Sequence, residues 1–176
     1  MKATGIVRRI DELGRIVIPK EIRRVLRIAE GDPIEIYTDE ECVLLKKYAR
    51  IREIGDYAGT CCQALCGALG FSAAVSDTEQ VLHAAGPLKK KLLGLVLPSA
   101  YTERMRAGKL VAERDGFLLS DGFEPVLKLC AAPVSAMGDL IGSILIATDD
   151  PRLDLTEPEI RVVKTAALYL GKLLEG

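Results

Sequence analysis

The sequence lacks the features that would place it in a membrane or an export route. No run of about eighteen apolar residues, the length of a membrane-spanning helix, occurs in its 176 residues. The basic start has no apolar stretch behind it, as a signal peptide would require. These absences predict a cytoplasmic protein that makes no contact with a membrane. With 49% hydrophobic residues, it has the composition of a packed globular protein.

Signs of catalysis are also scarce. Neither a G-x-G-x-x-G motif nor a P-loop is present, and the single histidine, His83, lacks the defined partners that a catalytic triad needs. The adjacent carboxylates Asp149 and Asp150 would point to opposite sides of a strand, and Pro151 marks a turn there. The sequence therefore predicts a protein that is not an enzyme and that uses no cofactor.

The cysteines do not have the spacing of a disulfide framework or a zinc site. Their number is odd, and no C-x-x-C pair occurs. Cys62 and Cys66 share a helix face at i, i+4, where small buried thiols are common. We expect no metal site and a structural role for all five, which are Cys42, Cys61, Cys62, Cys66 and Cys130.

The near-neutral charge of the chain hides an asymmetry. There are 24 lysines and arginines against 25 acids, a formal net charge of −1. Residues 1–28 hold eight basic residues and three acids, so they carry +5 and the remainder carries −6. A basic N-terminal segment followed by an acidic remainder is typical of a nucleic-acid-binding module joined to a second domain. The alternative is that the basic residues only form a solvated surface. The basic residues are Lys2, Arg8, Arg9, Arg15, Lys20, Arg23, Arg24 and Arg27.

Four short runs rich in Ile and Val follow one another in the first fifty residues, each bounded by turn residues. Such runs predict β-strands in hairpins. Between the second and third runs, a proline at the first helical position and a glycine beyond the end delimit a short helix. The predicted strands are 5–10, 15–18, 34–37 and 43–45, and the predicted helix is 19–28.

The short helix is one-sided. Each residue of a helix is turned by about 100° from the one before it, so Ile22, Val25 and Leu26 lie on one side of this helix. The basic residues lie on the opposite side. Arginine bonds two phosphate oxygens or a guanine edge at once through its planar guanidinium group. The helix therefore presents a cationic face suited to duplex DNA.

Two of the predicted strands, over 16–18 and 43–45, are apolar at every position rather than at alternate ones. Continuous apolar strands need cover on both faces. A domain of about 50 residues has too little interior to provide that cover alone. The sequence therefore predicts that this domain folds as an obligate homodimer.

The stretch MKATGIVRRIDELGRIVIPKEIRRVLRIAEGDPIEIY, with LLKKY after it, resembles the DNA-binding domain of the AbrB-type transition-state regulators. The resemblance implies an all-β swapped-hairpin barrel with a short helix, in which two chains interleave and basic residues grip double-stranded DNA. Residues 1–50 would form this domain. The continuation after Tyr48 resembles, more loosely, the sporulation regulators of spore-forming bacteria that carry such a domain.

The resemblance also implies which basic residues contact DNA. The four expected main contacts are Arg8, Arg15, Arg23 and Arg24. The expected supporting contacts are Arg9, Lys20 and Lys2. Because the helix is too short for an ordinary major-groove recognition helix, we expect most of the affinity from phosphates and part of the specificity from DNA shape. The family implies loosely specific, A·T-rich sites.

The rest of the chain is patterned as a second domain. We expect a short linker over 51–55 that enters a helix, and an α+β domain over 56–176 with flanking helices. Thr156 and Glu159 make a capping box that opens the last helix. A hairpin turn is predicted over 136–139. The other predicted strands and helices are 72–75, 81–85, 89–96, 99–107, 110–112, 117–119, 126–135 and 140–148.

This order of elements resembles a GAF domain. Because no clear signature for a cyclic nucleotide, haem or bilin is present, the effector would be an unidentified small molecule. His83 and Cys130 lie on predicted strands and are the candidates for lining a pocket. A buried structural role is the alternative for both, and general burial preferences favour it.

The last helix is apolar over an arc of about 180°, wider than the roughly 100° that one packing surface needs. The first helix of the domain is similarly wide. Since extra apolar surface usually marks an interface, we expect the second domain to join two dimers into a homotetramer through a four-helix bundle. Leu170 and Leu174 are expected in that seam.

Together these features predict a DNA-binding transcriptional regulator, associated with the nucleoid, that activates or represses sporulation or stationary-phase genes. Its GAF-like domain would serve effector sensing or assembly. The alternative is an antitoxin of the swapped-hairpin type, whose partner would be a toxin. Such antitoxins usually carry a disordered tail that wraps the toxin, whereas residues 56–176 are patterned for a folded domain.

Overall fold

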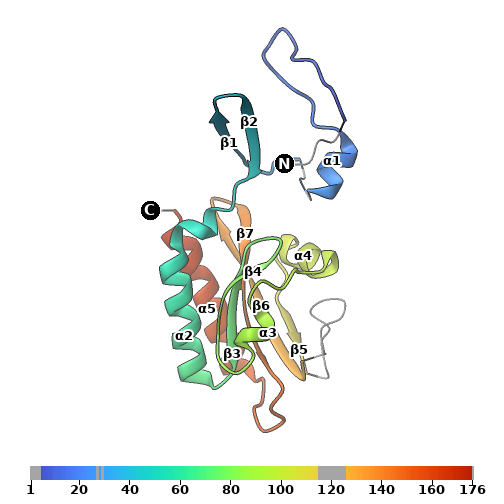
Figure 1. Cartoon of the computed structure of the whole chain (residues 1–176). Coiled ribbons are helices and arrows are strands. Elements are labelled where there is room, and N and C mark those ends of the chain that lie inside the picture. Colours follow the sequence, from blue (N-terminus) through green and yellow to red (C-terminus); the bar gives the residue numbers. More distant parts are fainter. Residues whose placement is uncertain (1–4, 27, 29, 115–125, 176) are drawn as a thin grey trace. The chain divides into compact units, whose positions relative to one another are not determined.

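A computed structural model of the chain describes residues 5–26, 28, 30–114 and 126–175. The chain divides into two compact units, Met1–Tyr48 and Ala49–Gly176, whose elements are labelled in Figure 1. We call them the N-terminal unit and the C-terminal unit. Among the described residues, no helix has both the length and the apolar character needed to cross a membrane.

The described residues of the N-terminal unit form one short helix and one paired hairpin. Helix α1 (Lys20–Val25) begins directly after Pro19, a residue whose fixed backbone angle suits the start of a helix. Strands β1 (Ile34–Asp39) and β2 (Cys42–Lys47) pair antiparallel along their whole length. The two-residue connection between them, Glu40 and Glu41, is acidic.

The predicted strands over 5–10 and 15–18 are not strands in the single chain. They form the two arms of a long open hairpin (Figure 1). The tip is closed by hydrogen bonds from Gly14 N to Asp11 O (2.9 Å) and from Asp11 N to Arg15 O (3.0 Å). The prediction is wrong for one chain because an apolar run becomes a strand only when a neighbouring backbone completes its ladder of hydrogen bonds.

Apolar side chains of the N-terminal unit remain exposed. None of its described residues is fully buried, and Val7 and Val25 keep 83% and 77% of their surface exposed. A domain is held together by apolar surface that it removes from water, so this unit needs cover from outside the single chain. The exposed large apolar residues are Ile6, Val7, Ile10, Leu13, Ile16, Val17, Val25, Leu26, Ile36, Tyr37, Val43, Leu44 and Leu45.

The C-terminal unit is a five-stranded antiparallel sheet between two layers of helices, with strand order β4-β3-β7-β6-β5. Helices α2 and α5 cover one face, and α3 and α4 cover the other (Figure 1). The elements are η1 (Arg50–Ile54), α2 (Gly55–Leu69), β3 (Ser72–Ser76), β4 (Val81–Ala85), α3 (Lys89–Leu92), α4 (Ser99–Arg106), β5 (Val111–Glu113), β6 (Lys128–Ala136), β7 (Asp139–Thr148) and α5 (Glu157–Leu173).

The central strands are buried on both faces. On β7, Ile144 and Ile146 belong to the core beneath α2 and α5, whereas Leu145 and Ala147 belong to the core beneath α3 and α4. Side chains alternate along a strand, so a strand between two layers must be apolar at nearly every position. The continuous apolar run in this part of the sequence therefore reflects two cores, one on each side of the sheet.

Most predicted elements of this unit are confirmed, and the capping box of Thr156 and Glu159 is present. At the hairpin turn, Met137 (φ 53°) and Gly138 (φ 90°) are both left-handed, as a two-residue turn between twisted strands requires. The helix predicted over 89–96 is too long, because α3 ends at Leu92 and Gly94 takes a φ of 78°. The strand predicted over 117–119 lies outside the described residues.

Residues 51–55, which were expected to be a linker, pack onto the C-terminal unit as η1 and the start of α2. Ile51 and Ile54 are buried in its core. Arg50 Nη2 donates to the carbonyl oxygen of Leu174 at 2.7 Å. Arg52 pairs with the largely buried Asp77 at 3.1 Å. Two buried side chains and Arg52 hold this segment, and Arg50 holds the residue before it, so residues 51–55 are not a flexible tether.

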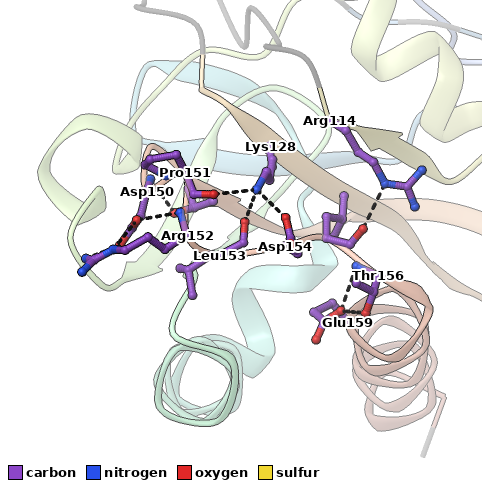
Figure 2. A network of polar contacts seen from close by, with 11 residues as sticks. Arg114, Lys128, Asp150, Pro151, Arg152, Leu153, Asp154, Thr156 and Glu159 are labelled. Carbon is purple, nitrogen blue, oxygen red and sulfur yellow. Dashed lines mark hydrogen bonds and ion pairs between the residues drawn. The ribbon is translucent and has the colours of Figure 1, made fainter.

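Two cations anchor the loop that leads into α5 (Figure 2). Lys128 Nζ donates to Asp154 Oδ1 at 2.8 Å and to the carbonyl oxygen of Leu153. Arg114 Nε donates to the carbonyl oxygen of Leu155 at 3.0 Å. These bonds satisfy backbone oxygens outside the regular elements, and charged donors make them strong. The start of α5, and with it the surface that α5 presents, is therefore held in place.

Gly142 in β7 has no room for a side chain. A Cβ at this position would lie 2.0 Å from the carbonyl oxygen of Ser76 on the neighbouring strand. We expect Gly142→Ala to lower the free energy of unfolding of the C-terminal unit by about 2–3 kcal/mol, the cost of overpacking a core. Thermal unfolding of the full chain measures this change.

Gly67→Ala is the control, because nothing lies within 4 Å of that Cβ position, and it should stabilise the helix by about 0.5–1 kcal/mol. Equal stability of Gly142→Ala and wild type would contradict the packing described.

Candidate nucleic-acid interface

The tip of the long hairpin in the N-terminal unit is organised by one carboxylate. Asp11 Oδ1 accepts the backbone N–H groups of Leu13 (3.0 Å) and Arg15 (2.8 Å). Its second oxygen accepts Arg15 Nε at 2.8 Å. Gly14 completes the turn with a φ of 75°, a left-handed conformation that glycine adopts without strain. The turn therefore sets both the backbone and the side-chain direction of Arg15.

The charge of Asp11 is secured by the same contacts. The backbone N–H of Arg15, followed by its guanidinium group, lowers the pKa of Asp11 below its ordinary value. The carboxylate therefore stays ionised at neutral pH and continues to orient Arg15. An exposed pair of this kind adds little stability, but an arginine has five N–H donors, so one bond to Asp11 leaves others for a phosphate.

The remaining candidate DNA contacts lie on two segments of the N-terminal unit, the hairpin arms and α1. Arg8 and Arg9 are exposed on the first arm, and Arg8 Nη1 donates to the carbonyl oxygen of Val7 at 3.0 Å. Lys20, Arg23 and Arg24 are exposed on α1. Within the described part of the chain, none of these five has an acidic partner at ion-pair distance, so their charge is open to an external anion. Lys2 and Arg27 lie outside the described residues.

The apolar side of α1 is less covered than its periodicity predicts. Ile22 is partly buried, whereas Val25 and Leu26 are exposed in the single chain. The cationic residues and these two apolar residues therefore both face outward. The exposed apolar residues mark a surface that packs against a partner.

The structure places the two candidate pocket residues on the same face of the sheet without bringing them together. His83 is on β4 and Cys130 on β6, with β3 and β7 between them. The His83 ring lies beneath α2, close to the Cβ positions of Gly55 and Gly59 (3.4 and 3.5 Å). Cys130 is fully buried in the core beneath α2 and α5. Both therefore pack under helices.

The buried thiols are held in their protonated form. Burial raises the pKa of Cys130 to about 11 and that of Cys62 to about 12. A thiol must lose its proton to act as a nucleophile or a metal ligand. Among the described residues, no group of three or more histidine, cysteine or acidic side chains is placed to hold a metal ion.

Sequence reasoning missed a chain of buried hydroxyl groups in the C-terminal unit. Tyr101 Oη lies 2.8 Å from Ser143 Oγ, which lies 2.7 Å from Ser76 Oγ. Burial raises the pKa of Tyr101, so its hydroxyl stays neutral. No sequence signal could have joined these residues, because they come from α4, β7 and β3. The role of Asp11 could have been inferred from its position three residues before the turn glycine.

The outward side of α5 forms a shallow apolar groove. Tyr169 is 51% exposed there, whereas Leu170 and Leu174, which were expected in a seam between chains, lie in the core of their own unit. The prediction that these two leucines lie between chains is therefore wrong, because the sheet of their own unit already covers them. The groove is lined by Arg161, Val162, Thr165, Ala166 and Tyr169.

Two family models match the chain. The model described as stage V sporulation protein T C-terminal, transcription factor, matches residues 53–175. The model described as antidote-toxin recognition MazE, bacterial antitoxin, matches residues 7–53. The two matches meet close to the division between the units at Tyr48 and Ala49.

The chain is similar over nearly its whole length to stage V sporulation protein T of Bacillus subtilis (strain 168), with 41% identity over 179 residues that cover 99% of each chain. Its first 27% is similar to the transition state regulatory protein AbrB of the same organism, with 67% identity over 48 residues, half of that protein. The C-terminal unit has the fold of the GAF domain of an Acinetobacter phosphoenolpyruvate-protein phosphotransferase (TM-score 0.55, 13% identity, 71% of this chain and 87% of that one). The predicted pairing of an AbrB-type and a GAF-like domain is thereby confirmed.

Proposed function

Because the chain belongs to the stage V sporulation protein T family of transcription factors, we propose that it regulates sporulation or stationary-phase genes by gripping duplex DNA with the arginines of its N-terminal unit. The chain is a DNA-binding transcription regulator. The observation that carries the proposal is the set of exposed cations on the hairpin and α1, of which Arg15 alone is held by an acid within the described residues.

The chemistry of these residues suits the phosphate backbone. Guanidinium groups form paired hydrogen bonds to phosphate oxygens, and the affinity they contribute depends steeply on salt. Arg8, Arg15, Arg23 and Arg24 are the proposed main contacts, and Arg9, Lys20 and Lys2 the supporting ones. Few cations reach base edges from so short a helix, so we propose loose specificity for A·T-rich sites, read partly through DNA shape.

The N-terminal unit is proposed to act as an interleaved homodimer of the swapped-hairpin type. The support is that none of its described residues is buried in the single chain and that the arms over 5–10 and 15–18 pair with no strand among the described residues. A second copy would supply both the missing ladder and the missing cover. Two copies also double the number of arginines that one DNA site meets.

The C-terminal unit is proposed to join two such dimers into a tetramer and to receive a small-molecule effector of unknown chemistry. Val162 and Tyr169 support the first part, because they are exposed along the apolar groove of α5. We place the assembled regulator in the cytoplasm, on the nucleoid. The antitoxin alternative draws on the match of residues 7–53, but the similarity to a single relative over 99% of the chain favours the regulator.

Replacing Arg24 by alanine should weaken binding to many DNA sequences alike. A dimer that neutralises two fewer phosphates should show a log–log salt slope reduced by about 2. Filter-binding titrations of the full chain over a range of salt concentrations measure this slope. Arg24→Lys is the control, because it keeps the charge and should keep most of the slope while losing the paired hydrogen bonds. An unchanged slope and affinity in Arg24→Ala would remove Arg24 from the interface.

A further inference from the structure

The C-terminal unit is acidic overall, but its positive charges are concentrated in one part of the sequence. The unit holds fourteen lysines and arginines against sixteen acids. One stretch of it, residues 86–110, holds six of those cations and a single acid, Glu103. The rest of the unit therefore has eight cations against fifteen acids. Along the chain this stretch carries +5, and Glu113 and Asp149, which lie against two of its cations, reduce the local charge to +3 (six cations less three acids). An excess of positive charge on an acidic unit produces a favourable field for anions over one part of the surface.

The fold places this stretch on one side of the sheet. Leu88 and Leu92 of the α3 segment and Tyr101 and Met105 of α4 are buried in the core on that side. Their anchoring turns the charged neighbours outward, and all six cations are exposed. The opposite face of the sheet is covered by α2 and α5. We call the exposed cations the α3–α4 basic surface, which consists of Lys89, Lys90, Lys91, Arg104, Arg106 and Lys109.

Cations elsewhere in the unit are mostly engaged with the protein itself. Arg50, Arg114 and Lys128 donate to backbone carbonyls, and Arg152 and Lys172 pair with acids at 2.7 and 2.5 Å. These cations hold loops and helix ends together. Their charge is therefore largely used within the unit.

The α3–α4 basic surface is engaged only in part, because three of its six lysines and arginines have no acidic partner among the described residues. Lys91 lies 3.9 Å from Asp149, at the limit of an ion pair, and Arg104 pairs with Glu113 at 3.1 Å. In the part of the chain that the structure describes, Lys89, Lys90 and Lys109 have no acid at ion-pair distance. Their charge contributes nothing to the fold that the structure shows and is available to an anion outside the unit.

We propose that the α3–α4 basic surface is a second DNA contact, which binds phosphates that flank the site held by the N-terminal unit. This inference rests on the proposed function, since the duplex must first be held. Residues 1–48 carry ten cations against nine acids, so the N-terminal unit as a whole has little excess charge to attract a polyanion. Three adjacent lysines, whose ammonium groups act as flexible point charges, suit phosphates without regard to base sequence.

Tethering makes even a weak second contact effective. When the N-terminal unit is on DNA, the C-terminal unit of the same chain stays close to the flanking duplex, so the second contact needs no separate association from solution. Each phosphate that a lysine neutralises releases counterions, which adds about 0.9 to the log–log salt slope. The contact would therefore extend the footprint and the salt dependence without adding sequence specificity.

The test compares the full chain with the variant Lys89→Gln, Lys90→Gln, Lys91→Gln on two duplexes. One duplex is just long enough for the N-terminal units, and the other is extended by two helical turns, about 21 base pairs, on each side. On the extended duplex, the variant should bind about tenfold more weakly than wild type near 0.1 M salt, with a slope lower by about 0.9 for each phosphate that the lysines no longer neutralise. On the short duplex the two proteins should bind alike.

The matched control is the variant Arg152→Gln, Lys164→Gln, Lys172→Gln. It also removes three positive charges, but from other parts of the unit. It should behave as wild type on both duplexes. Equal weakening in both variants would show a net-charge effect and overturn the second contact. An unchanged slope in the lysine variant would also overturn it and leave the surface for an acidic protein partner. If the wild-type protein binds neither duplex, the proposed function fails together with the second contact. If Arg24→Ala weakens binding to both duplexes while the lysine variant binds as wild type, the proposed function holds and only the second contact fails.

Discussion

Glutamate in place of Leu170 should unfold the C-terminal unit. Leu170 is fully buried beneath the sheet in the core shared by α2 and α5. A carboxylate there would have to give up its hydration without a partner or take up a proton, and the poorer packing adds to that cost. We expect the free energy of unfolding to fall by more than about 4 kcal/mol, which approaches the whole stability of a domain at the lower end of the usual range of about 5–15 kcal/mol. Circular dichroism of the full chain against temperature measures this change.

The neighbouring residue provides the comparison. Tyr169 is exposed in the groove of α5, so Tyr169→Glu should change the free energy of unfolding by only about 0.5 kcal/mol. If the groove joins two dimers, the same substitution should convert tetramers into dimers that still bind DNA. Sedimentation of wild type and variant distinguishes the two effects. A wild type that is already dimeric, or a Tyr169→Glu protein that remains tetrameric, would contradict assembly through this groove.

The fragment 1–50 should be folded only as a dimer. In the single chain, the arms of its hairpin expose six large aliphatic side chains, from Ile6 to Val17. Full burial of each stabilises a fold by about 1.5–3 kcal/mol, so a partner that covers them would contribute on the order of 10 kcal/mol per chain. Without that contribution a unit of this size has no core. Folding and association should therefore be a single transition whose midpoint temperature rises with protein concentration.

Analytical ultracentrifugation combined with circular dichroism tests the coupling. Dilution of the fragment should remove the dimer and the folded signal together. Val17→Asp should abolish both at all concentrations, because it places a charge in the surface that must be covered. Arg24→Ala, which changes an exposed cation on α1, should leave both intact. A folded monomeric fragment would rule out the interleaved dimer.

Features that depend on neighbours in sequence were predictable. The capping box of Thr156 and Glu159 forms between residues three positions apart, and the turn at Met137 and Gly138 needs only two left-handed residues in a row. A dense local motif and a local excess of charge also mark the cations of the proposed DNA interface, whose contacts with DNA stay a prediction. The role of Asp11 was missed although it is equally local, because Asp11 was counted only as a charge and not as a hydrogen-bond acceptor three residues before the turn glycine.

Features that depend on distant contacts were not predictable. Helical periodicity placed Leu170 in the same wide apolar arc as Tyr169, although the sheet covers the first and leaves the second exposed. The run over 16–18 has the composition of a strand, yet it pairs with no strand in the described part of its own chain. Residues 51–55 were interpreted as a linker because no nearby residue indicates that Ile51 is buried. Ile51 packs beside Gly142, which lies about ninety residues later in the sequence. In each case the deciding neighbour is not encoded nearby.

The amino-acid sequence by itself determined the two-domain organisation, the cationic N-terminal segment and most helices and strands of the C-terminal unit, since turns, caps, periodicity and charge act over a few residues. Only the tertiary structure decided which side of α5 is buried, how η1 is locked onto the sheet, and that the lysines of α3 and the cations of α4 lie on one side of an acidic unit. Those outcomes depend on which surfaces meet when segments far apart in the chain pack together, and packing removes some apolar and charged groups from solvent while leaving identical groups exposed.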